Sequence, residues 1–138
     1  MEQLIAAAAD TTPIDVNMDN FMAEVIDGSA KMPIVVQFWA PWCGPCKQLG
    51  PLLEKVVAAA KGKVKMVRIN IDENQQIAQQ MRVQSVPTVY GFFNGQQVDG
   101  FAGAEPESTL KQFIDKLVAA GGSGPDVGQW SRRQTAFL

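Results

Sequence analysis

Strand-like and helix-like patterns alternate along this chain, and the clearest case is a buried strand that leads directly into a helix. Residues 33–40, PIVVQFWA, are rich in β-branched and aromatic residues, as expected of a central strand. After Cys46, apolar residues recur at helical spacing, and Pro45 suits the first turn, where its missing N–H group is not needed. Pro51 lies inside this helical pattern, and we expect it to kink the helix. A strand and a helix in this order are one unit of a layered α/β fold.

The rest of the chain continues the alternation and adds a hairpin. Residues 13–16 predict a short edge strand, followed by a first helix that ends at Gly28. Residues 65–72, KMVRINID, predict a further strand before a short helix. Asn94-Gly95 predicts a hairpin turn, because this pair accepts positive φ angles. The apolar stripes expected to face the core are Phe21, Met22, Val25 and Ile26 in the first helix, and Leu110, Phe113, Ile114, Leu117 and Val118 in a last helix that Pro106 can open.

This order of elements, βαβαβα followed by ββα, predicts an α/β fold with three layers, α/β/α. Alternating strands and helices build a parallel core sheet with helices on both faces, and the hairpin adds antiparallel strands. We therefore expect a central mixed sheet of about five strands with about four helices.

The length of 138 residues fits a single folded domain with short additions at both ends. We assign residues 1–13 to an N-terminal extension, 14–120 to the domain, and 121–138 to a Gly/Pro linker and C-terminal tail. The tail mixes apolar and basic residues, and our hypothesis is that it packs on its own domain or on a neighbouring copy.

Charge and the N-terminal pattern limit the partners and the compartment. The formal net charge of −2 and the lack of a Lys/Arg cluster argue against nucleic acid or a membrane as partner. The start, MEQLIAAAAD, has an acidic residue where a signal peptide has basic ones, and its apolar run is short. We expect the cytoplasm or another reducing compartment, in which a lone cysteine pair is not a permanent crosslink.

Cys43 and Cys46 are the only two cysteines, and the pair could form a zinc site, a structural disulfide or a redox pair. A zinc site needs about four ligands, whereas the chain has no histidine and no carboxylates at ligand spacing. A structural disulfide between residues three apart closes a loop too short to restrict the unfolded chain much. What remains is a redox pair that needs no metal and no cofactor other than its own disulfide.

Cys43 lies where the central strand gives way to the helix. The unpaired N–H groups and the positive dipole end of the helix favour a thiolate there, so we expect a lowered pKa for Cys43. Cys46 is one turn further along, and we expect it to be more buried and to remain a thiol until it is needed.

Several motifs, in order and over roughly residues 14–119, resemble the thioredoxin family: FWAPWCGPCK, Pro51, NIDEN, VPTV, the Asn94-Gly95 turn and Gly103. The resemblance implies a thioredoxin-like fold and a protein-disulfide reductase in which Cys43 attacks, Cys46 resolves, and Pro87 is a cis proline. Its implied partners are proteins with disulfides, and thioredoxin reductase or glutathione as electron donor. The residues implied to support the pair are Trp39, Gly44, Pro45, Gln37 and Arg68, and those implied to bind substrate are Trp42, Val86, Pro87 and Gly103. For the apolar members, an ordinary core position is the alternative.

Gln37 departs from the family pattern. Typical thioredoxins carry a carboxylate at this strand position, which helps to move the proton on and off the resolving cysteine. An amide can form hydrogen bonds but cannot take up a proton, and Arg68, which stands where the family has a lysine, cannot give one up. We expect an intact nucleophile and slow turnover.

The segment from FFNG to DKLV resembles more closely the thioredoxin domain of bacterial chaperedoxins, co-chaperones that hand clients to a chaperonin. VDGF followed by G-x-x-P-E carries this resemblance. Two functions therefore stay open. One is a dithiol–disulfide oxidoreductase, which the complete WCGPCK stretch favours. The other is a holdase or adaptor that binds unfolded clients on the same apolar surface and delivers them to a chaperonin.

Overall fold

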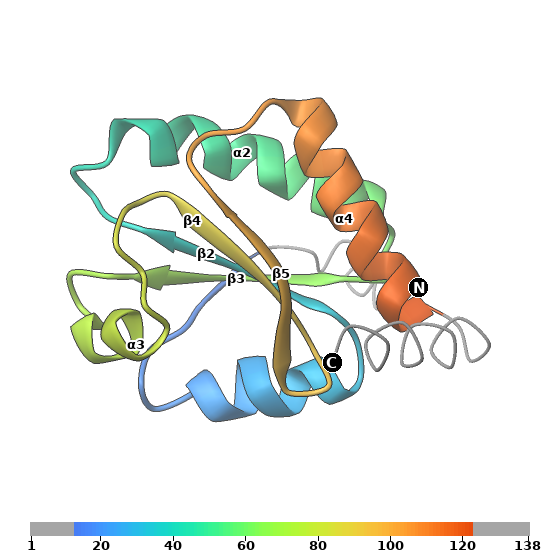
Figure 1. Ribbon diagram of the computed structural model, residues 1–138, viewed down its shortest axis with the longest axis horizontal. Coiled ribbons are helices and arrows are strands. Elements are labelled where there is room, and N and C mark those ends of the chain that lie inside the picture. Colours follow the sequence, from blue (N-terminus) through green and yellow to red (C-terminus); the bar gives the residue numbers. More distant parts are fainter. Residues whose placement is uncertain (1–12, 123–138) are drawn as a thin grey trace, which may run out of the picture.

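A five-stranded sheet forms the centre of the computed structural model, which describes residues 13–122 (Figure 1). The strand order is β1-β3-β2-β4-β5, with β1, β3 and β2 parallel and with β4 and β5 antiparallel to their neighbours. The strands are β1 (Ile14–Asp15), β2 (Ile34–Trp39), β3 (Lys65–Asn70), β4 (Thr88–Phe93) and β5 (Gln96–Ala102). The predicted mixed sheet is confirmed. The predictions for the N-terminal extension and for the tail fall almost wholly on residues 1–12 and 123–138, outside the described residues.

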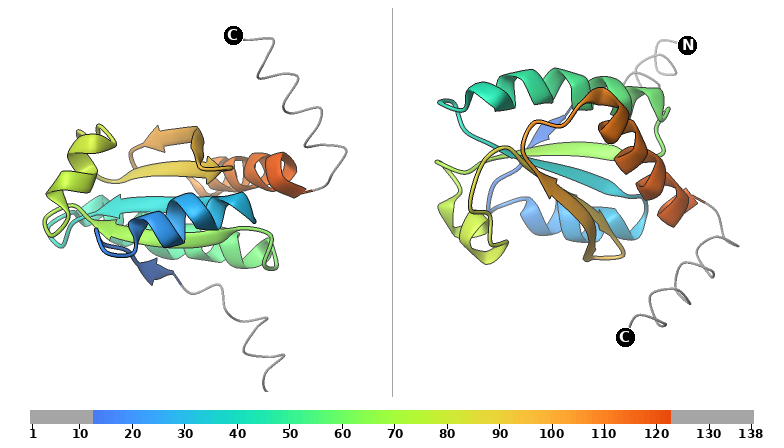
Figure 2. Two further views of the ribbon diagram at one scale, coloured as in Figure 1. Left: turned by 90° about the horizontal axis from the view of Figure 1, so that it is seen from below. Right: turned by 45° about the horizontal axis from the view of Figure 1, so that its top comes forward.

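Helices cover both faces of the sheet and complete the three predicted layers (Figures 1 and 2). On one face lie α2 (Gly44–Ala59) and α4 (Glu107–Gly122). On the other lie α3 (Gln75–Gln80) and the helical segment η1 (Met22–Asp27), which continues into η2 (Gly28–Ala30). The predicted α/β class and order of elements are confirmed.

The first helix differs from its prediction in two respects. It does not end at Gly28, because a short 3₁₀ turn carries the helical path on to Ala30. Met22, counted in the apolar stripe, is 60% exposed. The cause is the π-helical hydrogen bonding of η1. A π-helix is wider than an α-helix, so residues spaced for an α-helical stripe no longer face one side.

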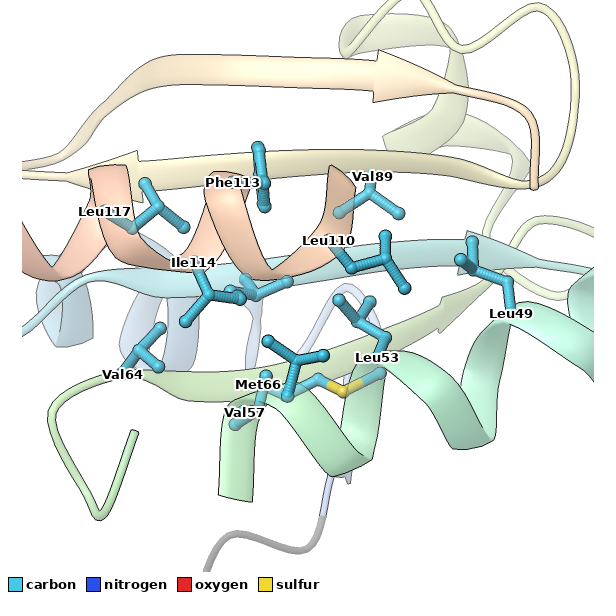
Figure 3. Packing of buried hydrophobic residues seen from close by; sticks show 12 residues of the cluster. Leu49, Leu53, Val57, Val64, Met66, Val89, Leu110, Phe113, Ile114 and Leu117 are labelled. Atoms are coloured by element: carbon cyan, nitrogen blue, oxygen red, sulfur yellow. The ribbon is translucent and has the colours of Figure 1, made fainter. Parts of the chain in front are cut away.

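Two apolar cores hold the sheet between its helices. The larger core lies between the sheet and the pair α2 and α4, and Figure 3 shows leucines from both helices pointing toward the strands. Of the predicted last-helix residues, Leu110, Phe113, Ile114 and Leu117 are buried in this core, and Val118 packs against it but is only partly buried. The second core lies on the side of η1 and α3 and includes Val25, Phe38 and Ile77. The sheet is thus packed on both faces, which fixes the strand ends that carry the site.

The predicted hairpin turn is confirmed and is tied to the first helix. Asn94 and Gly95 have φ angles of 56° and 75°. Ser29 is fully buried, and its carbonyl oxygen accepts a hydrogen bond from the Asn94 N–H at 2.8 Å. The Ser29 Oγ accepts another from the Gly95 N–H at 2.7 Å. These bonds satisfy the two N–H groups of the turn and tie it to η2.

Gly91→Ala is expected to destabilise the fold by about 1–3 kcal/mol, because it overpacks the larger core. A Cβ atom at Gly91 would lie 2.6 Å from Cδ2 and 2.9 Å from Cδ1 of the buried Leu117. Urea unfolding measures the change. The matched control is Gly28→Ala, where the new Cβ would lie no closer than 3.5 Å to its neighbours and the backbone is helical. Equal midpoints for the two variants would contradict the close packing of α4 on β4.

Candidate active site

Cys43 occupies the N-cap of α2, directly after the loop that follows β2. Its backbone is extended, with φ −87° and ψ 104°, and its N–H donates to the Ala40 carbonyl at 3.0 Å. The helix then begins at Gly44, and Pro45 lies in its first turn, as the sequence predicts. The end of the strand and the start of the helix therefore fix the position of the Cys43 sulfur from both sides.

Cys43 and Cys46 form a disulfide, and the Cys43 Sγ also accepts a hydrogen bond from the Cys46 N–H at 3.1 Å. The Cys46 N–H group has no partner within the helix, as is usual in a first turn, and it points at the Cys43 sulfur instead. This contact would stabilise negative charge on that sulfur after reduction, because a backbone N–H is a fixed donor and the helix dipole adds to it.

Both cysteines are buried in this disulfide form. Cys43 is 3% exposed and Cys46 is 5% exposed. The expectation that Cys46 is the more buried of the two is therefore wrong for the oxidised protein. The reason is that the loop from Ala40, together with the partly buried side chains of Trp39, Ile71 and Val86, packs around both residues.

A cis peptide bond joins Val86 to Pro87, as the resemblance implies. Val86 packs against the cluster of Ala40, Cys43 and Cys46, called the cysteine cluster below. The segment of Val86 and Pro87 therefore forms one side of the site, called the wall below. The Pro87 carbonyl accepts a hydrogen bond from the Gly103 N–H at 2.8 Å. Gly103 has a φ of +98°, a conformation that residues with a Cβ atom rarely adopt. The structure therefore places Gly103 directly beside Pro87 at the end of β5.

Trp42 is 67% exposed, yet its indole ring is held in place. Its Nε1 atom donates to the two carboxylate oxygens of Asp72, at 3.3 and 3.0 Å. Asp72 was not among the predicted site residues. The motif NIDEN contains it, but nothing in the sequence pairs it with a tryptophan 30 residues away. Asp72 thus ties the loop before α2 to the loop after β3.

The three remaining predicted residues form a layer beneath the disulfide. Trp39 packs against the cysteine cluster, and the Arg68 guanidinium lies over its ring, 4.4 Å from the centroid. Gln37 pairs in register with Arg68 and is fully buried below α2. The structure thus brings Trp39 and Val86 into contact with the cysteines, and it places Gln37 and Arg68 on the strands below α2. Pro87 and Gly103 adjoin Val86, whereas the indole of Trp42 is hydrogen-bonded to Asp72.

Between residues 13 and 122, no group of three or more His, Cys, Asp or Glu side chains could hold a metal ion. Within the same range, none of the helices has the length and apolar character that crossing a bilayer requires.

Three features occur together: the α/β sandwich, the disulfide at the start of a helix and the adjacent cis proline. They are typical of proteins that carry out thiol–disulfide exchange. Residues 12–116 match the family model named Thioredoxin. The chain is 41% identical over 112 residues to thioredoxin 1 of Nostoc sp. (strain PCC 7120 / SAG 25.82 / UTEX 2576), covering 81% of this chain and 98% of that protein. It is 42% identical over 96 residues to thioredoxin 1 of Synechococcus elongatus, covering 70% of this chain and 88% of that one.

A solved structure supports the same assignment. The crystal structure of Malassezia sympodialis thioredoxin (Mala s 13) superimposes with a TM-score of 0.71 at 36% identity, covering 79% of this chain and 93% of that one. The chain therefore belongs to the thioredoxin family. It is a dithiol–disulfide oxidoreductase whose redox pair is the disulfide between Cys43 and Cys46.

Proposed function

We propose that the protein reduces disulfides in other proteins, with Cys43 as the nucleophile and Cys46 as the resolving thiol. The observation that carries this assignment is the Cys46 N–H directed at the Cys43 sulfur at the start of α2. Cys43 attacks a substrate disulfide and forms a mixed disulfide, and Cys46 then attacks Cys43 and releases the substrate. Thioredoxin reductase or glutathione returns the pair to the dithiol form.

The substrate polypeptide lies on the surface that Trp42, Val86, Pro87 and Gly103 form. The position of Val86 against the cysteine cluster and the Gly103 bond to the Pro87 carbonyl support this role, since both bring the wall next to the sulfurs. Trp42 is the exposed member of this surface, whereas Val86 and Gly103 are half-buried and Pro87 is buried. An exposed indole next to a reactive group suits a polypeptide partner. Trp39, Gly44, Pro45, Gln37 and Arg68 support the pair from the helix start and from the layer beneath.

Alkylation of the reduced protein tests the two roles. One equivalent of an alkylating agent at mildly acidic pH is expected to modify Cys43 and to spare Cys46. The physical reason is that the helix start lowers the pKa of the Cys43 thiol, and the thiolate is the form that reacts. Peptide mass mapping identifies the labelled residue, and the unfolded protein in urea is the control, in which the two should react alike. Labelling of Cys46 first would reverse the assignment.

A chaperedoxin-type adaptor is a second candidate. The features that favour it are the VDGF and G-x-x-P-E segments and the indole of Trp42, which is 67% exposed next to Cys43 in sequence. In this role the surface would hold unfolded clients for a chaperonin, with the cysteines as an occasional covalent hook. Suppression of client aggregation by a variant with both cysteines replaced by serine would support it, and loss of suppression would remove it.

The cytoplasm is the compartment we propose. Both cysteines of the chain belong to the exchange pair, so its fold calls for no structural disulfide and no oxidising compartment.

A further inference from the structure

A row of polar residues crosses the sheet beneath the start of α2. Asp15 on β1 pairs in register with Arg68 on β3, and Arg68 pairs with Gln37 on β2. Residues paired in a parallel sheet project from the same face, and neighbouring strands lie about 4.8 Å apart. The row therefore runs from an exposed carboxylate at the edge of the sheet to a fully buried amide near its centre.

The buried end of the row lies below the helix that carries the redox pair. A Cβ atom at Gly50 would lie 3.7 Å from Nε2 and 3.8 Å from Oε1 of Gln37. Gly50 is four residues after Cys46, so both lie on the same side of α2. Trp39, next to Gln37 on this face of β2, packs directly against the cysteine cluster. Gln37 and Trp39 thus connect the row to Cys46.

Several buried polar atoms in and beside the row have no hydrogen-bond partner within residues 13–122. They are Nε2 and Oε1 of Gln37, Nε1 of Trp39 and Nε of Arg68. Leaving such a group unsatisfied costs about 1–3 kcal/mol, so four in one cluster call for bound water or for a functional reason.

A cavity of about 220 Å³ opens at the edge of the sheet beside the same residues. Its lining includes Asp15, Trp39 and Arg68, and also Glu73 from the loop before α3. The volume has room for several water molecules, and the lining is polar enough to bind them. The cavity therefore brings Trp39 and Arg68, which carry two of the unpartnered atoms, to solvent beside the carboxylate of Asp15. Gln37 does not line the cavity and adjoins it through its register pairing with Arg68.

We propose that this row is the route by which the proton of Cys46 leaves during resolution, with Asp15 as its solvent end. Water held between Gln37, Trp39 and Arg68 carries the proton, because neither the amide nor the guanidinium takes it up. Asp15 accepts it and returns it to bulk solvent. The charged groups that face Asp15 across the cavity are Arg68 and Glu73.

The inference rests on the proposed roles of the two cysteines. In the resolving step, the Cys46 thiol loses its proton to the row and the Cys46 sulfur attacks Cys43. The bond between Cys43 and the substrate sulfur breaks, and a bond between Cys43 and Cys46 forms. The electron pair goes to the substrate sulfur, which leaves as a thiolate and takes a proton from solvent. The dithiol is oxidised and the substrate disulfide is reduced.

Asp15→Asn tests the proposal in stopped-flow measurements of the two steps. Resolution of the mixed disulfide is expected to slow about three- to tenfold at neutral pH, because water replaces only part of the acid–base assistance. The first attack by Cys43 is expected to keep its rate. Asp27→Asn, on the opposite side of the sheet, is the matched control, and Glu73→Gln distinguishes the second carboxylate at the cavity.

The outcomes separate clearly. An unchanged resolution rate in Asp15→Asn overturns the proposal, as does an equal slowing of both steps, which would indicate a structural effect. A similar slowing of resolution in Asp27→Asn would show that the rate responds to surface charge in general, which also overturns the proposal. Slowing in Glu73→Gln alone would place the solvent end of the proton route at Glu73 and not at Asp15. Should the unmodified protein form no mixed disulfide through Cys43, the proposed roles of the cysteines fail instead, whatever Asp15 does.

Discussion

Cys43→Ser is expected to lose disulfide reduction entirely, whereas Cys46→Ser should stop after one step and accumulate a mixed disulfide with its substrate. A serine hydroxyl at the helix start is far less ionised than a thiol, so the first attack should slow by about 10³-fold or more. With Cys46 replaced, Cys43 still attacks, but nothing within the protein displaces the substrate.

Turnover of a disulfide-bonded protein is measured with a reductant in excess, and adducts are measured separately, by mass spectrometry of the pre-reduced protein after mixing with substrate in the absence of reductant. The unmodified protein should reduce many disulfides per chain. Cys46→Ser should yield one covalent adduct per chain, which a small thiol releases. An adduct with Cys43→Ser but not with Cys46→Ser would show that the roles are exchanged. Because both variants lose the disulfide, they are matched in stability with each other rather than with the unmodified protein.

Gln37→Asp is expected to speed resolution of the mixed disulfide, by up to about 10²-fold. The change places a group that can take up a proton below Gly50, one turn from Cys46. The attack by Cys43 should change little, because that step uses a thiolate that is already formed. Stopped-flow mixing that resolves the two steps tests this, with Gln37→Asn as the control that keeps an amide. Equal resolution rates in all three proteins would make Gln37 an ordinary core residue.

The same substitution should lower the stability of the reduced protein, and the loss should grow with pH. Burial raises the pKa of the introduced carboxyl, and the neighbouring Arg68 offsets only part of that shift. Below the unfolded pKa of about 3.9, this carboxyl is protonated in both the folded and the unfolded state, so its ionisation costs no stability. As the pH rises from that value through the raised folded pKa, the free energy of unfolding falls. Urea unfolding at several pH values measures this loss. In this background, Asp15→Asn should no longer slow resolution.

Much of the fold could be predicted because each element has a local cause. The apolar run of β2, the stripe of α4 and the Asn94-Gly95 turn depend on residues close together in sequence, and all three were confirmed. Met22 was misplaced because the spacing of apolar residues does not distinguish a π-helical segment from an α-helix. The exact end of a helix is likewise weakly encoded, which explains the error at Gly28.

The redox pair was recognisable from its spacing, whereas its surroundings depend on contacts between distant segments. The bond from Trp42 to Asp72 joins two loops, and the row from Asp15 to Gln37 requires the register of three strands. No local pattern encodes a register between separate strands. The burial of Cys43 equally depends on how the Val86 segment packs, and an argument from the helix start alone could not include it.

The burial of both cysteines determines which partner conformations can react. In the disulfide form, 3% and 5% of these residues are exposed. Because the same loop and the Val86 segment surround the pair after reduction, we expect an attacking or leaving sulfur to have only a narrow approach to it. A disulfide recessed inside a well-packed partner cannot reach it, whereas one on a protruding or loosened segment can. We therefore expect reactivity toward a given protein to depend on how often that protein opens locally, so that a destabilised or partly unfolded partner is reduced ahead of its native form. A recessed redox pair would in this way discriminate among the folding states of other proteins by their shape.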